Sequence, residues 1–146
     1  MSKLIFLNLP VADLPAAKAF YEAIGATNNP MFTDDTAACM VLSDVIHVML
    51  LTHEKFAQFT PKRIADAGET SEVLLCIALE SREAVDEITE KALAAGAREP
   101  NAPDEHGFMY GRSFEDPDGH MWGPLWMDVE AATAAMAKPQ PEPAQA

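Results

Sequence analysis

The chain has 146 residues, of which 49% are hydrophobic and 23% are charged, as is typical of a single globular domain with a sizeable core. Its 23 acidic residues outnumber its 10 basic ones, and the formal net charge of −13 opposes binding to nucleic acids and to anionic membrane surfaces. No apolar run approaches the roughly 20 residues of a membrane-spanning helix, and the N-terminus lacks a signal-peptide pattern. We therefore expect a cytoplasmic protein with neither nucleic acid nor membrane as a partner.

The first part of the chain predicts a strand, a helix and three further strands within residues 3–52. Residues 4–9 form an apolar, strand-like run. Asp13 then caps a helix with an apolar stripe, and Gly25 ends it. After the helix the apolar period changes from about 3.6 to 2, which indicates short strands. These strands are expected near residues 27–32, 36–43 and 45–52.

A second part of the chain, residues 72–128, repeats this order. Residues 73–79 read as a strand, Ser81 caps a helix, and Gly96 ends it. Three strands are expected near residues 97–101, 107–114 and 120–127. The sequence therefore predicts two tandem β-α-β-β-β modules within a single domain, residues 1–130.

Two segments fall outside these modules. Residues 53–71 predict a short helix near 54–59 followed by a polar linker. Beyond Asp128 the chain is Ala-rich and then Pro-rich. We expect the tail, residues 131–146, to be disordered because such a composition cannot bury enough apolar surface.

The chain has two cysteines, Cys39 and Cys76. They are too few and too far apart in sequence for a disulfide scaffold or a cysteine zinc site. Both lie in apolar, strand-like segments, so we expect two buried thiols.

Several motifs together suggest a family. Val11-Ala12-Asp13-Leu14 leads into a helix that bears Phe20-Tyr21, and Val48-Met49-Leu50-Leu51 forms an apolar strand. The run from Arg112 to His120 contains Asp116-Pro117-Asp118-Gly119, which fits a type I turn between antiparallel strands. In these motifs the chain resembles the vicinal-oxygen-chelate superfamily, which includes glyoxalase I, the bleomycin-resistance proteins, extradiol dioxygenases and fosfomycin-resistance enzymes.

This resemblance covers residues 3–128. It implies an α+β fold in which the two tandem modules form an eight-stranded, open curved sheet whose hollow holds the ligand. It also implies a homodimer, and it leaves open whether the modules pair within one chain or between two chains. Since a fold does not determine its chemistry, the site residues need separate inspection.

In the metal-dependent members of this superfamily, ligands come from the first and last strands of both modules. The matching positions here are Phe6, the pair His47 and Met49, Cys76 (or Leu75 with a one-residue gap), and Gly123 in place of a glutamate. A catalytic metal site needs about three protein ligands. His47 is the only good ligand in this set, so we expect no metal ion and no other cofactor.

The expected hollow remains even without a metal site. It would be mainly apolar and enlarged at Gly123, with Asn8 and His47 as polar groups. The candidate ligand-binding residues are Phe6, Asn8, His47, Met49, Cys76, Tyr110, Arg112, Trp122 and Gly123. For Trp122 the alternative is packing in the core, and for Arg112 it is pairing with one of the many carboxylates.

Three functions remain open at this level. The first is a metal-free protein of the bleomycin-resistance kind that binds a small aromatic or cationic molecule at a dimer interface. The second is an enzyme, either a metal-dependent lyase or dioxygenase of the superfamily, or one that uses His47 as a general base. The third is a non-catalytic interaction domain that has kept the fold and lost the site.

Overall fold

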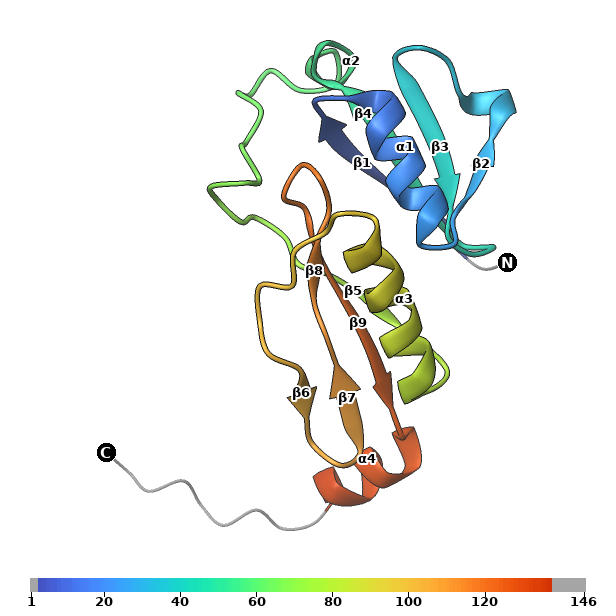
Figure 1. Cartoon of the computed structure of the whole chain (residues 1–146), viewed down its shortest axis with the longest axis vertical. Helices are drawn as coiled ribbons and strands as arrows, with labels where there is room; N and C mark the ends of the chain where they lie inside the picture. Colours follow the sequence, from blue (N-terminus) through green and yellow to red (C-terminus); the bar gives the residue numbers. More distant parts are fainter. Residues whose placement is uncertain (1–2, 138–146) are drawn as a thin grey trace.

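The computed structural model describes residues 3–137, which fold into two modules joined by a linker (Figure 1). The first module contains β1 (Ile5–Val11), α1 (Leu14–Ala23), β2 (Thr27–Asn29), the 3-10 helix η1 (Pro30–Phe32), β3 (Ala37–Val41) and β4 (Ile46–Thr52). The second module contains β5 (Leu75–Ala78), α3 (Arg82–Ala94), β6 (Asp104–Glu105), β7 (Met109–Gly111), β8 (Phe114–Glu115) and β9 (Met121–Met127). Helix α2 (His53–Ala57) begins the linker, and α4 (Val129–Ala137) follows β9.

The strands form two separate sheets. The first has the order β1-β4-β3-β2, and the second has the order β5-β9-β7-β6 with β8 also paired to β9. In each sheet the first strand of the module lies parallel to its last strand. This arrangement confirms the predicted α+β class. The described residues do not form one eight-stranded sheet, because no pairing joins β1 to β5 and each of these strands keeps a free edge.

One long helix covers one face of each sheet (Figure 1). Asp13 Oδ1 accepts a hydrogen bond from the Ala16 amide and so caps α1, while Ser81 Oγ accepts one from the Ala84 amide and caps α3. Both caps agree with the sequence-based expectation, because capping depends only on local chemistry. The buried side chains of α1 are Leu14, Ala17, Phe20 and Tyr21, and those of α3 are Val85, Thr89 and Ala92. The faces opposite these helices carry the candidate site.

A buried polar network joins the two modules. The Tyr21 hydroxyl of α1 donates a hydrogen bond to Asp116 Oδ2 at 2.6 Å, and Trp122 Nε1 of β9 donates to the same hydroxyl at 3.0 Å. Asp116 is only 5% exposed. Burial raises the pKa of the Asp116 carboxyl group above its usual value, and burial also raises the pKa of Tyr21. This network fixes the two modules relative to each other.

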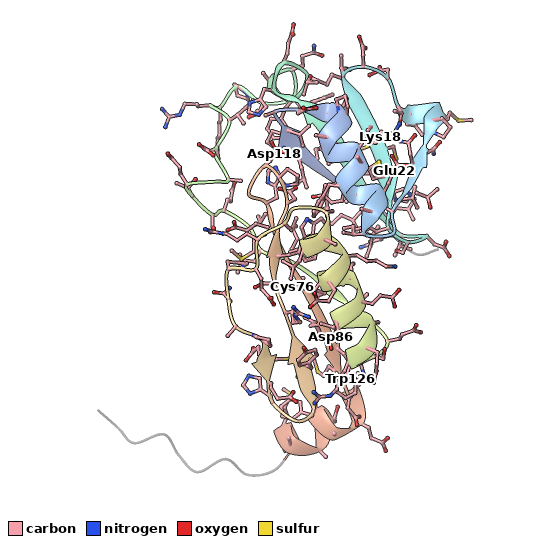
Figure 2. All side chains as sticks on the ribbon, viewed as in Figure 1. Lys18, Glu22, Cys76, Asp86, Asp118 and Trp126 are labelled. Atoms are coloured by element: carbon pink, nitrogen blue, oxygen red, sulfur yellow. The ribbon has the colours of Figure 1, made fainter. Side chains whose placement is uncertain are left out.

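The turn at residues 116–119 makes a second junction with the first module. The Ala12 amide donates a hydrogen bond to Asp118 Oδ1 at 2.8 Å. His120 Nε2 donates one to the Pro10 carbonyl oxygen, also at 2.8 Å. Figure 2 shows Asp118 at the boundary between the modules. The predicted turn therefore also serves as a contact between the modules.

The segment after β9 differs from the expectation of a disordered tail. Residues 131–137 belong to α4, in which Asp128 Oδ1 accepts a hydrogen bond from the Ala131 amide and Ala132 is buried. Alanine has the highest helix propensity, so a few well-placed contacts are enough to order this stretch. The rest of the expected tail, residues 138–146, lies outside the described residues. Within residues 3–137, no helix has the length and apolar character needed to cross a membrane.

Candidate functional site

The first half of the candidate site lies on the first sheet, on the face opposite α1. Strand alternation turns Phe6 and Asn8 of β1 away from the core. Phe6 is in register with His47 of β4, and Asn8 is in register with Met49. The rings of Phe6 and His47 stack, with centroids 4.6 Å apart and an interplanar angle of 17°. The structure thus brings these four predicted residues together on one face.

The His47 ring is stacked on Phe6, and one of its nitrogens is buried without a partner among the described residues. His47 Nδ1 is buried and has no hydrogen-bond partner within the described part of the chain. A metal-binding or general-base histidine normally has a carboxylate or carbonyl group that fixes its tautomer. No such group contacts His47 Nδ1 within residues 3–137, and the imidazole is stacked on the Phe6 ring instead.

The second half of the candidate site lies on the second sheet, opposite α3. Cys76 of β5 is in register with Gly123 of β9. A Cβ atom at Gly123 would lie 3.2 Å from Cys76 Sγ, which is tighter than an ordinary contact, so the glycine lets the thiol lie close against β9. Both residues line a hollow of about 500 Å³. Cys76 is exposed, so the expectation of a buried thiol is wrong there, whereas Cys39 is buried as expected and its pKa is raised by desolvation.

The hollow includes residues that the sequence analysis missed. Ser113 is only 8% exposed, and its Oγ atom has no hydrogen-bond partner among the described residues. Further lining comes from Leu74, Asn101, Met109, Met121 and Leu125. Alternation along β9 places Met121 and Leu125 on the same face as Gly123, so the sequence contained that signal. Ser113 lies between two short strands, where no periodic pattern marks its direction.

Two other candidates, Tyr110 and Arg112, use their side chains on the helix-covered face. Arg112 forms ion pairs with Glu99 at 2.9 Å, with Asp86 at 3.1 Å and with Glu90 at 3.0 Å. Its pKa is raised, mainly by the hydrogen bond to Glu99. The Tyr110 hydroxyl donates to Asp86 Oδ1 at 2.6 Å, which lowers the pKa of Asp86. These polar groups already have partners and face away from the hollow.

Trp122 also has a structural partner. Its side chain is 1% exposed, and its indole packs against Tyr21 in a T-shaped pair with centroids 6.1 Å apart. Trp122 and Arg112 border the hollow. Their polar atoms, however, point away from it, where Trp122 Nε1 donates to the Tyr21 hydroxyl and Arg112 donates to Glu99. Their placement agrees with the two structural alternatives considered for them, core packing and carboxylate pairing.

The donor set does not fit a divalent metal ion. Within residues 3–137, no three His, Cys, Asp or Glu side chains are grouped so that they could hold a metal. Phe6 and Gly123 stand at two of the positions compared with metal ligands and supply no donor atom. The remaining donors, His47 and Cys76, lie on different sheets. Residues 3–137 of one chain therefore do not provide a site with about three convergent ligands.

The two halves of the site are separated within a single chain. Figure 2 shows Cys76 well inside the second module, whereas the Phe6 and His47 stack belongs to the first sheet. The strands that carry Phe6 and Cys76 are the edge strands β1 and β5, and both have free edges. Each half therefore borders a strand with one unpaired edge.

Comparison with known proteins places this geometry in a family. The sequence model described as Glyoxalase/Bleomycin resistance protein/Dioxygenase superfamily matches residues 3–123. Comparison with curated proteins gives no match.

Solved structures agree with this fold. The hypothetical protein SA1046 from S. aureus is 26% identical with a TM-score of 0.71, covering 86% of this chain and 95% of that one. A glyoxalase-related enzyme from Fulvimarina pelagi is 18% identical with a TM-score of 0.73, covering 88% and 91%. A bleomycin resistance determinant encoded on the transposon Tn5 is 20% identical with a TM-score of 0.61, covering 87% and 99%. At such identities these structures support the fold and leave the ligand open.

Proposed function

We infer that this protein, which belongs to the Glyoxalase/Bleomycin resistance protein/Dioxygenase superfamily, binds a small molecule in an apolar hollow without a metal ion. The observation that carries the proposal is the pair of substitutions at the compared ligand positions. Phe6 places an aromatic ring over His47, and Gly123 contributes no side chain to the hollow that it lines together with Cys76. The first change adds binding surface and the second adds space.

The lining of the hollow indicates the class of ligand. It is mainly apolar, with the Cys76 thiol, the Asn101 amide and the unpartnered Ser113 hydroxyl as polar groups. A few polar groups in an apolar pocket are typical of sites for small organic molecules. The net charge of −13 attracts cations. A small, partly aromatic or cationic molecule matches these features best.

A second copy of the chain completes the site in this proposal. Five large apolar residues at or beside the free edges of β1 and β5 are at least half exposed: Leu4, Ile5, Phe6, Val73 and Leu74. Pairing β1 with β5 of a second copy would satisfy both edges and bury these side chains. It would also place the Phe6 and His47 stack opposite the Cys76 and Gly123 hollow of that copy. The expected assembly is a homodimer with two equivalent sites.

Ligand binding is tested by a thermal-shift screen with cationic glycopeptides, aromatic compounds and glutathione conjugates. A ligand present at about 100 times its Kd should stabilise the fold by about 2.7 kcal/mol. Gly123→Met should project a side chain into the hollow that Gly123 and Cys76 line, and should abolish the shift. Ala134→Met adds the same side chain at an exposed position of α4 and should leave the shift unchanged. A screen without any shift would contradict the proposal and favour a pure interaction domain.

The metal-free character is tested separately by elemental analysis of protein purified without chelators. We expect no stoichiometric divalent ion. A stoichiometric ion that disappears in the His47→Ala variant would overturn the metal-free proposal and support a metal-dependent enzyme. Sedimentation at micromolar concentration tests the dimer, and a monomer at that concentration would contradict the shared site.

A further inference from the structure

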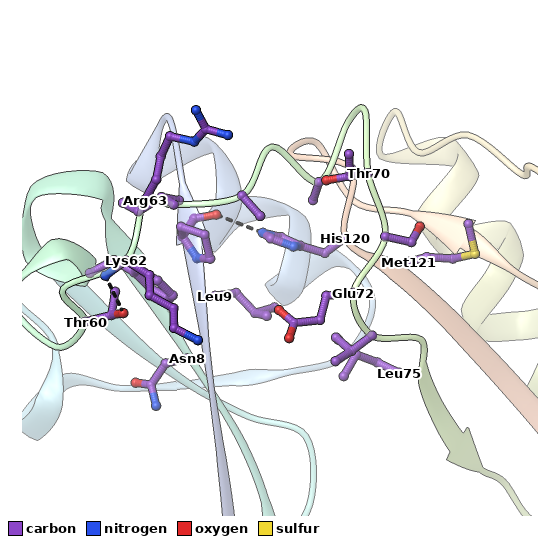
Figure 3. A pocket seen from close by; sticks show the side chains of 18 residues that line it. Asn8, Leu9, Thr60, Lys62, Arg63, Thr70, Glu72, Leu75, His120 and Met121 are labelled. Atoms are coloured by element: carbon purple, nitrogen blue, oxygen red, sulfur yellow. Dashed lines mark hydrogen bonds between the residues drawn. The ribbon is translucent and has the colours of Figure 1, made fainter.

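A second cavity lies at the junction of the two modules, apart from the hollow at Gly123. It has a volume of about 300 Å³ and lies between the linker, the end of β1 and the start of β9 (Figure 3). Met121 borders both cavities, but the other lining residues differ. The volume is near the lower end of the range of about 300–1,000 Å³ for small-molecule sites. This cavity therefore suits a compact ligand.

Three polar side chains point into this junction cavity. Figure 3 shows the Lys62 ammonium group and the Glu72 carboxylate extending from the linker toward the same space, with the Asn8 amide of β1 beside them. Neither Lys62 nor Glu72 forms an ion pair or a side-chain hydrogen bond within the described part of the chain. The amide of Asn8 makes only a long hydrogen bond of 3.5 Å, to the Phe6 carbonyl oxygen. A cation, an anion and an amide are thus free to bind a ligand.

Lys62 is one of several cations among residues 3–137 that have no carboxylate partner, while four others are ion-paired. Arg82, Lys91, Arg98 and Arg112 all pair with carboxylates. Arg63 is adjacent in sequence to Lys62, but its guanidinium group points away from the cavity centre (Figure 3). Lys62, which points into the cavity, can therefore be compared with Arg63, which belongs to the same linker but points away from it.

Most of the rest of the wall is apolar, and part of it is fixed. The apolar residues include Leu9, Phe56, Ile64, Val73 and Leu75, and Thr60, Thr70 and Ser71 also line the cavity. His120 also borders the cavity, and its hydrogen bond to the Pro10 carbonyl oxygen at 2.8 Å holds the ring in place. An apolar wall next to separated positive and negative groups matches a ligand with an apolar body and both charges.

We propose that the junction cavity binds a small zwitterion with an apolar body, of the class of a free aliphatic amino acid. Lys62 binds its carboxylate, and Glu72 together with the Asn8 side-chain oxygen binds its ammonium group. The ligand would bridge the linker and β1, so it would also stabilise the arrangement of the two modules. This site lies at the junction of the modules and goes beyond the proposed function of the sheet faces, with which it shares Asn8 and Val73.

Isothermal titration of the full chain with three related probes tests the proposal. L-leucine carries both charges, leucinamide carries only the cationic group, and isocaproate carries only the carboxylate. We expect leucine to bind at least tenfold more tightly than either of the other two, a difference of about 1.4 kcal/mol. If leucine does not bind, or if isocaproate or leucinamide binds as tightly, the zwitterion site is refuted.

Variants of the linker give an independent test. Lys62→Gln and Glu72→Gln should each weaken leucine binding at least tenfold, because each removes one charged partner. Arg63→Gln removes a charge from the same segment and should leave the affinity within twofold of the parent protein. Equal losses in Lys62→Gln and Arg63→Gln would mean that only the general charge of the linker matters, and would overturn the assignment. Unfolding temperatures measured on all three variants exclude a loss of fold as the cause.

Discussion

The two modules share a topology but are stabilised by different interactions. Most of the buried apolar residues of the described chain belong to the first module, where Met40, Val48 and Leu50 form the centre of the core. The second module contributes all three buried polar or charged residues: Thr89, Ser113 and Asp116. It also holds the Arg112 ion-pair cluster and the Arg82 side chain, which stacks over the Tyr110 and Trp126 rings.

This difference shows that one chain order can be stabilised by two kinds of contact. A core of apolar side chains responds to changes in volume, whereas a cluster of charged groups responds to pH and salt. The same contrast extends to the candidate site, because Phe6 adds bulk in the first module and Gly123 removes it in the second. Destabilising substitutions in the first module should therefore have effects that do not depend on salt, whereas those in the charged cluster of the second module should depend on it.

The largest effect is expected from a cavity in the first module. Leu50 is fully buried between α1 and the sheet, and Leu50→Ala should lower the free energy of unfolding by about 2–5 kcal/mol. Urea denaturation measures this change. The loss should be the same at low and high salt because no charge is involved. A salt-dependent loss would contradict the apolar description of this module.

A smaller but salt-dependent effect is expected from the second module. The Arg112 side chain is 10% exposed and binds three carboxylates. Arg112→Gln should cost about 1.5–3 kcal/mol, since it removes charge-assisted hydrogen bonds and leaves the carboxylates near one another. The difference from the parent protein should shrink in 1 M salt. A loss that stays constant with salt would mean that Arg112 acts by packing alone.

The junction between the modules allows a matched pair of glycine variants. Gly119 has φ +92°, and a Cβ atom there would lie 2.7 Å from the Gly68 amide nitrogen of the linker. Gly96 has a similar φ of +101° with nothing within 4 Å. Each alanine variant should lose about 1–2 kcal/mol from backbone strain, and Gly119→Ala should lose more because the linker must also move. Equal unfolding temperatures for the two variants would show that the linker does not pack there.

Local features of this fold were predictable from the sequence, while those set by distant contacts were not. The caps at Asp13 and Ser81 and the turn after Asp116 depend on neighbouring residues, so pattern and chemistry were enough. The division into two sheets depends on which strand lies beside β1, and no local pattern encodes that choice. The helix at residues 129–137 was missed because composition suggested disorder.

The site followed the same division. Strand alternation alone predicts that Phe6 shares a face with Asn8 and that His47 shares one with Met49. The register that places Phe6 beside His47 and Cys76 beside Gly123 is a property of the tertiary structure. Three of the candidates, Tyr110, Arg112 and Trp122, have partners across α3 and the core that only the tertiary structure shows. The junction cavity could not be anticipated, since the path of the linker creates it.

The smallest expected effect is a change in the pH dependence of stability at the junction. Burial raises the pKa of Asp116 in the folded state, so the folded chain binds this proton more tightly than the unfolded chain does. The stabilisation that Asp116 provides is therefore fully present below the pKa of this group in the unfolded chain. It is lost as the pH rises through the higher pKa of the folded chain. Asp86 behaves oppositely, because its lowered pKa gives stability that is lost as the pH falls.

Asp116→Asn should remove the part of the pH profile in which stability declines with rising pH above about 4. The amide keeps an oxygen that accepts the backbone hydrogen bonds of the turn, so the fold should persist. Urea denaturation between pH 4 and 8 measures the slope, and Asp86→Asn serves as the control that alters only the acid side. If the Asp116→Asn profile follows that of the parent protein, the buried carboxylate does not titrate at the junction, and the contrast between the modules rests on Arg112 alone.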